Sequence, residues 1–259
     1  MPIKFYKYQG AGNDFIVIDN RDLQFERTNH ERIAQWCDRR FGVGSDGLML
    51  LENAEGYDFK MVYYNADGRE GSMCGNGGRC IVAFAHDMGI IEDNTRFIAV
   101  DGEHEASLSK DGTWVRLKMI DVNSVAREGD DYVLNTGSPH YVRLVDDLDT
   151  YDVVKEGRKV RYNDVYKAEG INVNFVEPQG TGYAVRTYER GVEDETLACG
   201  TGVTAVAIAM AVDRGETGSL MVPVKARGGN LKVSFERSGT VFHDIFLEGP
   251  AQFVFAGEI

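Results

Sequence analysis

The segment MCGNGGRCIVAFA, residues 73–85, returns later in the chain as ACGTGVTAVAIAM, residues 198–210. In both copies the pattern C-G-x-G opens a run of small apolar residues. Cys74 and Cys199 are 125 residues apart, close to half of the 259 residues. The same offset, without a gap, matches other residues of similar character: Asn13 with Ser138, Phe15 with His140, Glu52 with Glu177, Tyr63 with Tyr188, and Glu70 with Glu195. The sequence therefore predicts an old duplication into two similar halves, each with one such cysteine.

The residues after each C-G-x-G predict a buried helix. They are apolar or small on nearly every side, and Gly89 and Gly215 stand where the two helices would end. Each cysteine then lies at a helix N-terminus, where unpaired N–H groups attract anions and favour thiolate over thiol. If the halves face each other about a pseudo-twofold axis, both N-termini meet in one cleft. That cleft would be a carboxylate-sized anion site with a thiol on either side.

Two thiols on opposite sides of a carbon suit stereoinversion. One group removes the α-proton, and the other returns a proton from the opposite face. The helix N-termini would stabilise the charge that develops on the carboxylate as the proton leaves. A single C-G-x-G would be weak evidence, but two at the repeat offset argue against a chance match.

Other roles for the cysteines fit less well. A disulfide between Cys74 and Cys199 is disfavoured, because four cysteines in an acidic chain with no signal peptide indicate a reducing compartment. Zinc is disfavoured because Cys74-x5-Cys80 is not ligand spacing and no His/Cys group accompanies Cys199. Cys37 and Cys80 lie in apolar helical patterns and are expected in the core.

Length, charge and composition narrow the class of protein. The repeat favours two domains, and 43% hydrophobic residues are enough for sizeable cores. A net charge of −13 disfavours nucleic acid or an anionic membrane as partner. No apolar run reaches transmembrane length, so we expect no membrane association and a cytoplasmic protein.

Strand patterns surround one central helix in each half, which predicts an α+β fold. We expect two pseudo-symmetric domains, each a curled, mainly antiparallel sheet around its helix, with the active site in the cleft between them. The predicted boundaries are residues 1–121 and 122–249. A final strand at residues 250–259 exceeds the repeat and could cross back to the first half. The polar, patternless segment Asp121–Asp131 is the expected link.

Three local patterns complete this prediction. Thr28-x-x-Glu31 reads as a capping box that opens a helix with Ile33, Trp36 and Cys37 on its buried face. Residues 149–158 predict a short, weakly patterned helix. The glycine-rich loop at residues 41–47 lacks the lysine and the strand-to-helix setting of a phosphate-binding loop, so that interpretation is rejected.

Six motifs together resemble diaminopimelate epimerase. They are GAGNDF (10–15), YNADG (64–68), MCGNGxRC (73–80), GSPH (137–140), YERG (188–191) and ETLACGTG (195–202). The closing residues 249–259 also fit, so the resemblance covers essentially the whole chain. Proline racemases and phenazine-biosynthesis isomerases share the two-lobed architecture, but the latter lack the cysteine pair.

The resemblance implies interconversion of LL- and meso-diaminopimelate, a small-molecule substrate, in lysine and peptidoglycan synthesis. It implies no cofactor, neither pyridoxal phosphate nor a metal, and a homodimer. Cys74 and Cys199 match the two proton-transfer residues, and His140 and Glu189 match residues that tune the thiols. Substrate-binding positions match Asn13, Asn65, Gly75, Asn76, Ser138, Asn172, Glu189, Arg190, Gly200 and Thr201.

Two departures from the family pattern bear on the site. The family usually has asparagine where this chain has Ser138, and the loop Gly191–Glu195 is one residue longer than the usual form. Gly47 lies where the family often has a substrate-contacting glutamine, so only a backbone role is expected there.

Alternatives remain for both the residues and the whole chain. Taken singly, Asn13 and Asn65 could serve their turns, His140 could cap a strand, and Glu189 and Arg190 could be a surface pair. A related two-cysteine amino-acid racemase or a thiol redox sensor are the competing functions. A redox sensor has no need of Glu189-Arg190 or of paired anion sites. A catalytically inactive, ligand-binding relative would have no need to keep both cysteines. The sequence does not tell which cysteine is the resting thiolate.

Overall fold

The structure, a computed structural model, describes residues 2–71 and 74–259, so Met73 at the head of the repeated segment lies outside the described residues. The chain divides into two compact units. The first comprises the residues up to Leu117 together with Gly249–Ile259, and the second comprises Lys118–Glu248. No described helix is long and apolar enough to span a membrane.

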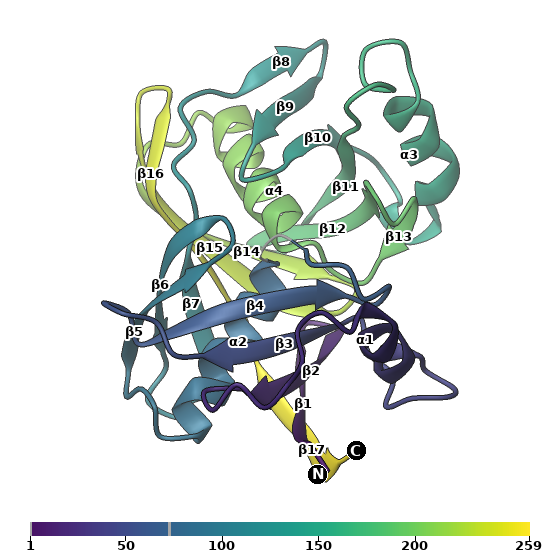
Figure 1. The fold of residues 1–259 in the computed structure, drawn as a ribbon. Helices are drawn as coiled ribbons and strands as arrows, with labels where there is room; N and C mark the ends of the chain where they lie inside the picture. The colour runs from purple at the N-terminus through teal and green to yellow at the C-terminus, as the bar shows by residue number, and fades with distance from the viewer. Residues whose placement is uncertain (1, 72–73) are drawn as a thin grey trace. The chain divides into compact units, whose positions relative to one another are not determined.

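The first unit is a sheet with two helices (Figure 1). Its elements are β1 (Lys4–Gly10), β2 (Asn13–Asp19), α1 (His30–Cys37), β3 (Gly47–Glu52), β4 (Phe59–Asn65), α2 (Gly75–Asp87), β5 (Asn94–Ala99), β6 (Gly102–Leu108), β7 (Trp114–Lys118) and β17 (Gln252–Glu258). The helix α2 packs against β1, β2, β3 and β6 and forms the centre of the unit.

The second unit repeats this plan. Its elements are β8 (Ala126–Glu128), β9 (Asp131–Asn135), β10 (Pro139–Leu144), η1 (Leu148–Thr150), α3 (Val153–Arg161), β11 (Asn172–Gln179), β12 (Gly182–Glu189), β13 (Asp194–Thr196), α4 (Gly200–Asp213), β14 (Gly218–Ala226), β15 (Gly229–Ser238) and β16 (Val241–Pro250). Here α4 is the central helix, and it packs against β9, β10, β11, β12, β14 and β15.

Strand pairing confirms the duplication. In the first unit β2 and β3 are parallel, β3 and β4 antiparallel, and β4 and β5 parallel, and β5–β6–β7 form an antiparallel meander. In the second, β10, β11, β12, β14, β15 and β16 repeat this order and these directions. Even the register repeats: Phe15 pairs with Gly47, and His140 pairs with Asn172, at the predicted offset.

The two central helices begin and end as the sequence predicts. The run Gly75–Ala85 of α2 is buried throughout, and so are all but one of the residues Gly200–Ala211 of α4. Gly89 and Gly215 follow the last turns with φ of 67° and 65°. In both helices the glycine N–H and the next N–H bond back to the last turn, which closes a Schellman motif.

The last strand lies in the first unit. β17 runs antiparallel to β1, and Ile3 and Ile259 exchange both backbone hydrogen bonds, at 2.8 and 3.0 Å. The two chain ends therefore lie side by side (Figure 1).

Two local predictions need correction. Thr28 does not cap α1: Asn29 is the N-cap, and its side chain accepts a hydrogen bond from the Arg32 N–H. Asparagine is among the preferred N-cap residues and competes here with the Thr28–Glu31 pattern. The predicted helix at residues 149–158 is instead η1 followed by α3, because Asp152 caps the start of α3 at Val153.

The segment Asp121–Asp131, which we expected to link the halves, contains a strand. It contains β8, which pairs with β9, and Val122 forms an isolated bridge with Phe242. Val122 and Phe242 exchange two backbone hydrogen bonds, at 2.9 and 2.8 Å, and both residues are buried, so this bridge anchors the segment.

Candidate active site

Cys74 is the N-cap of α2. Its backbone is extended, with φ of −97° and ψ of 130°, and its carbonyl accepts the first helical hydrogen bond, from Gly78 N at 2.7 Å. The N–H groups of the first turn have no partner inside the helix, and they carry the positive end of the helix dipole. The half-buried thiol of Cys74 therefore lies where negative charge is stabilised.

Cys199 occupies the same position on α4. It too is an extended N-cap, with φ of −113° and ψ of 112°, and its carbonyl accepts from Val203 N at 2.9 Å. Its residue is 9% exposed. The two cysteines thus share one backbone geometry, as the repeat predicts.

A directional hydrogen-bond chain leads to the Cys199 sulfur. Asn174 Nδ2 lies 3.1 Å from His140 Nδ1, His140 Nε2 lies 2.9 Å from Thr201 Oγ1, and Thr201 Oγ1 lies 3.4 Å from Cys199 Sγ. Because Asn174 Nδ2 can only donate, His140 Nδ1 accepts and the neutral ring carries its proton on Nε2. Nε2–H then donates to Thr201, whose hydroxyl can donate to the sulfur.

His140 is neutral in this arrangement. Burial, and secondarily the positive charge of Arg190, lowers the pKa of His140 to about 3. The ring is fully buried in β10, so it acts through the Thr201 hydroxyl as a fixed dipole rather than as a cation.

The second unit also gathers a polar group at the end of β12. Asn172 Nδ2 donates to Ser138 Oγ at 2.8 Å, and Asn172 Oδ1 accepts from the backbone N–H of Arg190 at 2.9 Å. The Arg190 guanidinium reaches Ser138 Oγ at 3.4 Å and the carbonyl of Glu169 at 3.1 Å. Ser138 therefore contacts both Asn172 and Arg190, although its side chain is shorter than the asparagine that the family usually has there.

Glu189 lies in the same strand, next to Arg190. Its carboxylate accepts a hydrogen bond from Thr196 Oγ1 at 2.8 Å, which ties the end of β12 to β13. β13 begins at Asp194, and its pairing with Glu189 closes the loop at residues 191–193.

In the first unit the amides of Asn13 and Asn76 meet. Asn76 Nδ2 donates to Asn13 Oδ1 at 2.5 Å, and Asn76 is buried in the first turn of α2. Asn65 ends β4 with its side chain exposed. Its amide lies beside Gly71, where a Cβ would meet Asn65 Nδ2 at 2.9 Å.

The other two cysteines lie in the core, as predicted. Cys37 and Cys80 are buried, and burial raises the pKa of Cys80 to about 12. None of the four cysteines, all within the described part of the chain, is in a disulfide.

Comparison with known proteins gives the family. A family model for diaminopimelate epimerase matches residues 5–125 and again residues 132–254, once in each half. The diaminopimelate epimerase of Flavobacterium psychrophilum is 53% identical over 254 residues, covering 98% of both chains. That of Aquifex aeolicus is 38% identical, covering 99% of this chain and 98% of its own. The chain belongs to the diaminopimelate epimerase family. It is therefore an isomerase.

Solved structures of lower identity share the fold of this epimerase family member. A phenazine biosynthesis protein of the PhzF family from Bacillus anthracis matches with a TM-score of 0.78 at 14% identity, covering 100% of this chain and 99% of its own. A hydroxyproline epimerase from Agrobacterium vitis matches with a TM-score of 0.71 at 13% identity, covering 100% and 92%. The α+β fold of two repeated domains is thus confirmed.

Sequence reasoning missed three polar residues of this epimerase site. Asn174 orients His140, and Asp46 and Arg79 hold the Asn13–Asn76 pair from its two ends. The signal for Asn174 was a polar residue in the middle of an apolar strand. Asp46 lies in the glycine-rich loop at residues 41–47, where the glycines suggest a phosphate-binding loop and conceal the role of the carboxylate.

Gly47 beside Asp46 has a steric reason to be glycine. A Cβ there would lie 2.5 Å from the Tyr63 ring and 2.5 Å from the Tyr64 carbonyl oxygen. The Tyr63 ring thus fills the space in which a longer side chain would begin.

Proposed function

We propose that this epimerase interconverts LL- and meso-diaminopimelate by a two-base mechanism in which Cys74 and Cys199 act on opposite faces of one α-carbon. The observation that carries the proposal is that each repeat places one cysteine at the N-cap of its central helix. Family membership supplies the substrate, since the relatives that match over the full chain are diaminopimelate epimerases.

The proton and electron movements balance without a cofactor. One cysteine thiolate takes the α-proton and becomes a thiol, and the electrons of the broken C–H bond move onto the substrate carboxylate. The other cysteine thiol then gives its proton to the opposite face of the carbon and becomes a thiolate. The configuration inverts, and the enzyme is left with the two protonation states exchanged.

The helix starts have a defined role in this step. The reacting carboxylate gains negative charge as the α-proton leaves, and the N–H groups of Gly75, Asn76, Gly200 and Thr201 are the donors that we assign to it. Fixed donors at helix N-termini cost no reorganisation during the reaction, which is why such groups lower a barrier effectively.

His140 tunes Cys199 through Thr201 in this proposal. A hydroxyl that accepts from His140 Nε2–H has its own hydrogen directed to the Cys199 sulfur. Such a donor stabilises the thiolate more than the thiol, so it favours deprotonation of Cys199. Glu189 is assigned the second tuning role on the family resemblance.

The group at Ser138, Asn172 and Arg190 is assigned to the distal amino-acid end of the substrate, together with Glu189, Asn13 and Asn65. A guanidinium donates to a carboxylate in a bidentate fork, amide N–H groups also donate to a carboxylate, and the Glu189 carboxylate and amide oxygens accept from an ammonium group. Lysine and alanine, which lack the distal amino-acid end, should therefore not be epimerised.

The direct test is incubation with LL-diaminopimelate under reducing conditions, followed by chiral separation. The wild-type protein should convert LL-diaminopimelate to the meso form, and Cys74→Ala and Cys199→Ala should each abolish this conversion. Efficient turnover of lysine or alanine would overturn the assignment of the distal group. Failure of the wild-type protein to form meso-diaminopimelate would overturn the proposed substrate.

We also propose a cytoplasmic homodimer. The sequence, which has no apolar run of transmembrane length, supports the location, and the family resemblance supports the dimer. In addition, β17 exposes three consecutive apolar residues, Phe253, Val254 and Phe255, at 52%, 51% and 44%. Adjacent exposed apolar residues often mark a protein–protein contact. Light scattering should give twice the chain mass of 28.8 kDa, and Phe253→Asp should shift it to a single chain. A wild-type mass of one chain would contradict the dimer.

A further inference from the structure

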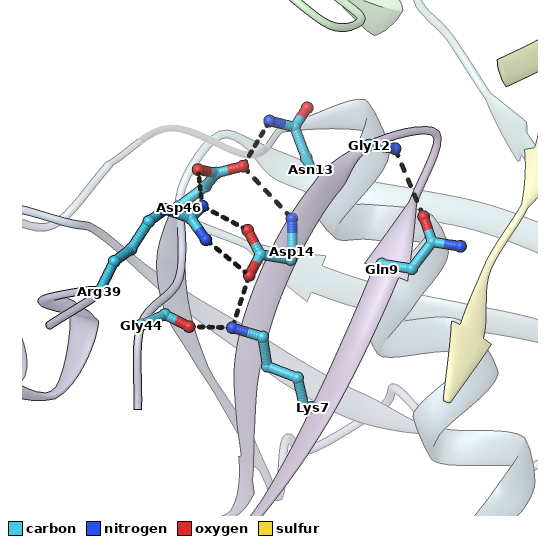
Figure 2. Close-up of polar contacts among 8 residues, drawn as sticks. All are labelled: Lys7, Gln9, Gly12, Asn13, Asp14, Arg39, Gly44 and Asp46. Carbon is cyan, nitrogen blue, oxygen red and sulfur yellow. Dashed lines mark hydrogen bonds and ion pairs between the residues drawn. The ribbon is translucent and has the colours of Figure 1, made fainter. Parts of the chain in front are cut away.

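A continuous line of side-chain hydrogen bonds crosses the first unit from Arg79 to Asp46. Arg79 Nη2 donates to Asn76 Oδ1 at 2.9 Å, and Asn76 Nδ2 donates to Asn13 Oδ1 at 2.5 Å. Asn13 Nδ2 then donates to Asp46 Oδ2 at 2.8 Å. Figure 2 shows this last link, with the Asn13 nitrogen turned towards Asp46 and its oxygen turned away.

The chemistry of the two ends fixes the direction of the line. A guanidinium can only donate, and an ionised carboxylate can only accept. Each asparagine between them offers one acceptor and one donor group. Reversing either amide would place two donors or two acceptors against each other, so the ends determine which way both amides face.

Asp46 is itself held in place. Its Oδ1 accepts from Arg39 Nη2 at 2.6 Å, while its Oδ2 also accepts from the backbone N–H of Asp14 at 3.3 Å. Arg39 is shared with the carboxylate of Asp14, which in turn pairs with Lys7 at 2.6 Å (Figure 2). Both Asp46 oxygens are therefore in use, and the carboxylate cannot be replaced by a group with a single acceptor.

Arg79 at the other end is an unusual residue to bury. Its side chain is fully buried in α2, and besides Asn76 it contacts only the carbonyls of Gly75 and Pro250, at 3.4 and 3.5 Å, among the described residues. A buried cation without a carboxylate partner is costly. Because hydrogen bonds to neutral oxygens do not replace a carboxylate partner, stability alone does not explain why Arg79 is buried here.

We propose that Asp46 and Arg79 are positioning residues that fix the amide orientation of Asn13 and Asn76 for substrate binding. The proposal rests on the function proposed above, in which both asparagines bind substrate. With Asn13 Oδ1 and one N–H engaged, its second amide N–H has no acceptor among the described residues. That N–H is directed to an acceptor on the substrate, and a carboxylate oxygen is the acceptor that diaminopimelate offers.

The first test is Asp46→Asn. An asparagine has one acceptor oxygen, which the charged Arg39 guanidinium will take, so its NH2 faces the Asn13 NH2 and the line breaks. KM for LL-diaminopimelate should rise about tenfold, the size expected for losing a charge-assisted hydrogen bond, with a smaller change in kcat.

Asp58→Asn is the matched control. Asp58 accepts from Thr95 Oγ1 at 2.9 Å and Arg96 N at 2.8 Å in the same unit, outside the line. Its KM should stay within about twofold of the wild-type value, below the size of one hydrogen bond. Equal KM values for Asp46→Asn and Asp58→Asn would overturn the proposal.

Arg79 is tested by a rescue pair. Arg79→Met removes the donor while filling the volume, and it should raise KM about tenfold. Arg79→Lys keeps a group that can only donate, so it should recover most of that loss. A lysine variant no better than the methionine variant would overturn the role given to the direction of donation, because lysine keeps both the charge and a group that can only donate.

A double-mutant cycle shows whether the substitutions at Asp46 and Arg79 act through the same line of hydrogen bonds or independently of each other. Asp46 and Arg79 share no contact, so independent effects would multiply to about a hundredfold in KM. If both act through Asn13 and Asn76, the second substitution finds the line already broken, and the double variant should stay near the weaker-binding single variant. A multiplicative result would overturn the proposal.

The same cycle measured by urea unfolding needs no substrate. Non-additive unfolding free energies would support the line even if the wild-type protein failed to epimerise LL-diaminopimelate, and additive ones would refute it. Should Arg79→Met not fold, Asn76→Ala replaces it in both cycles, because Asn76 is the next member of the line.

Discussion

The second glycine of C-G-x-G has different neighbours in the two repeats. A Cβ at Gly202 would lie 2.5 Å from Asn174 Oδ1 and 3.4 Å from Cys199 Sγ. A Cβ at Gly77 would meet only side-chain tips, the nearest being Met49 Sδ at 3.3 Å. Asn174 is bonded to Thr187, His140 and the Tyr141 carbonyl, so it cannot move aside as a methionine can.

We therefore predict that Gly202→Ala is damaging and Gly77→Ala is tolerated. Overpacking against Asn174 should lower the free energy of unfolding by about 1–3 kcal/mol and disturb the path to Cys199. At Gly77 the helix preference of alanine, about 1 kcal/mol, offsets the small movement of Met49. Urea unfolding and turnover of both variants measure this. Equal effects at the two positions would contradict the packing described.

His140 makes stability depend on pH. In the unfolded chain its pKa is near the ordinary 6.5, whereas burial lowers the folded value to about 3. Between these values the unfolded state binds the extra proton, so His140 destabilises the fold as pH falls through this window. Above about 6.5 both states are neutral there, and the effect disappears.

We expect the His140→Asn variant to lose less thermal stability than the wild type between pH 6.5 and pH 4. Thermal unfolding of both proteins at a series of pH values measures this difference. All groups other than His140 titrate alike in the two proteins, so their contributions cancel. Parallel curves for the two proteins would mean that His140 is not buried as a neutral ring.

At the scale of elements, the ends of the two central helices are the best-defined feature of the repeat. Gly89 and Gly215 both have positive φ, and a Cβ at either would meet nothing within 4 Å. The cost of a substitution there is therefore in the backbone, since left-handed geometry disfavours every residue with a Cβ.

Replacing Gly89 or Gly215 with alanine should each lower the free energy of unfolding by about 1 kcal/mol, with KM unchanged. Asparagine at the same positions should cost less, because it tolerates the left-handed region better than alanine does. Urea unfolding of the four variants tests this, and alanine variants as stable as the wild type would contradict the described caps.

The sequence predicted these helices well because their limits depend on local chemistry: a cysteine-glycine start, an apolar body and a glycine end. It failed where either of two adjacent residues could cap a helix: Asn29, and not Thr28, is the N-cap of α1. It also failed where a long-range contact decided, as with Val122 and Phe242.

The same distinction holds for the site. Motifs along the chain suggested Cys74, Cys199 and the asparagines, because each lies in a recognisable turn or helix start. Asp46 and Asn174 act through residues 33 and 34 positions away, and Arg79 acts through Asn76 inside the buried helix α2, and no local pattern predicts these contacts. Only the folded units bring these partners together.

At the scale of the whole molecule, the two halves share their strand order but not the surroundings of their cysteines. The first unit has a buried cation, Arg79, in the helix that Cys74 caps, and the second has a neutral His140 and Thr201 beside Cys199. At the position of Arg79, the second repeat has Thr204, whose hydroxyl bonds to the Gly200 carbonyl at 3.0 Å. A duplicated fold thus supports two chemically different thiols.

Such a difference suits an enzyme in which one cysteine rests as thiolate and the other as thiol. A perfectly symmetric pair would have no preference, whereas different surroundings stabilise one thiolate more than the other. The positive charge of Arg79 acts on Cys74, whereas Cys199 has the hydroxyl of Thr201 beside its sulfur.

The two-base mechanism is tested most directly by isotope incorporation in D2O. Early in the reaction from LL-diaminopimelate, the meso product should carry deuterium at the inverted centre, because the donating thiol has exchanged with solvent. The recovered LL substrate should carry none, because the thiolate that takes its proton can return only that proton, and not a solvent deuteron, to the same face. Deuterium appearing in recovered substrate as fast as product forms would indicate a single exchanging base and would contradict the account.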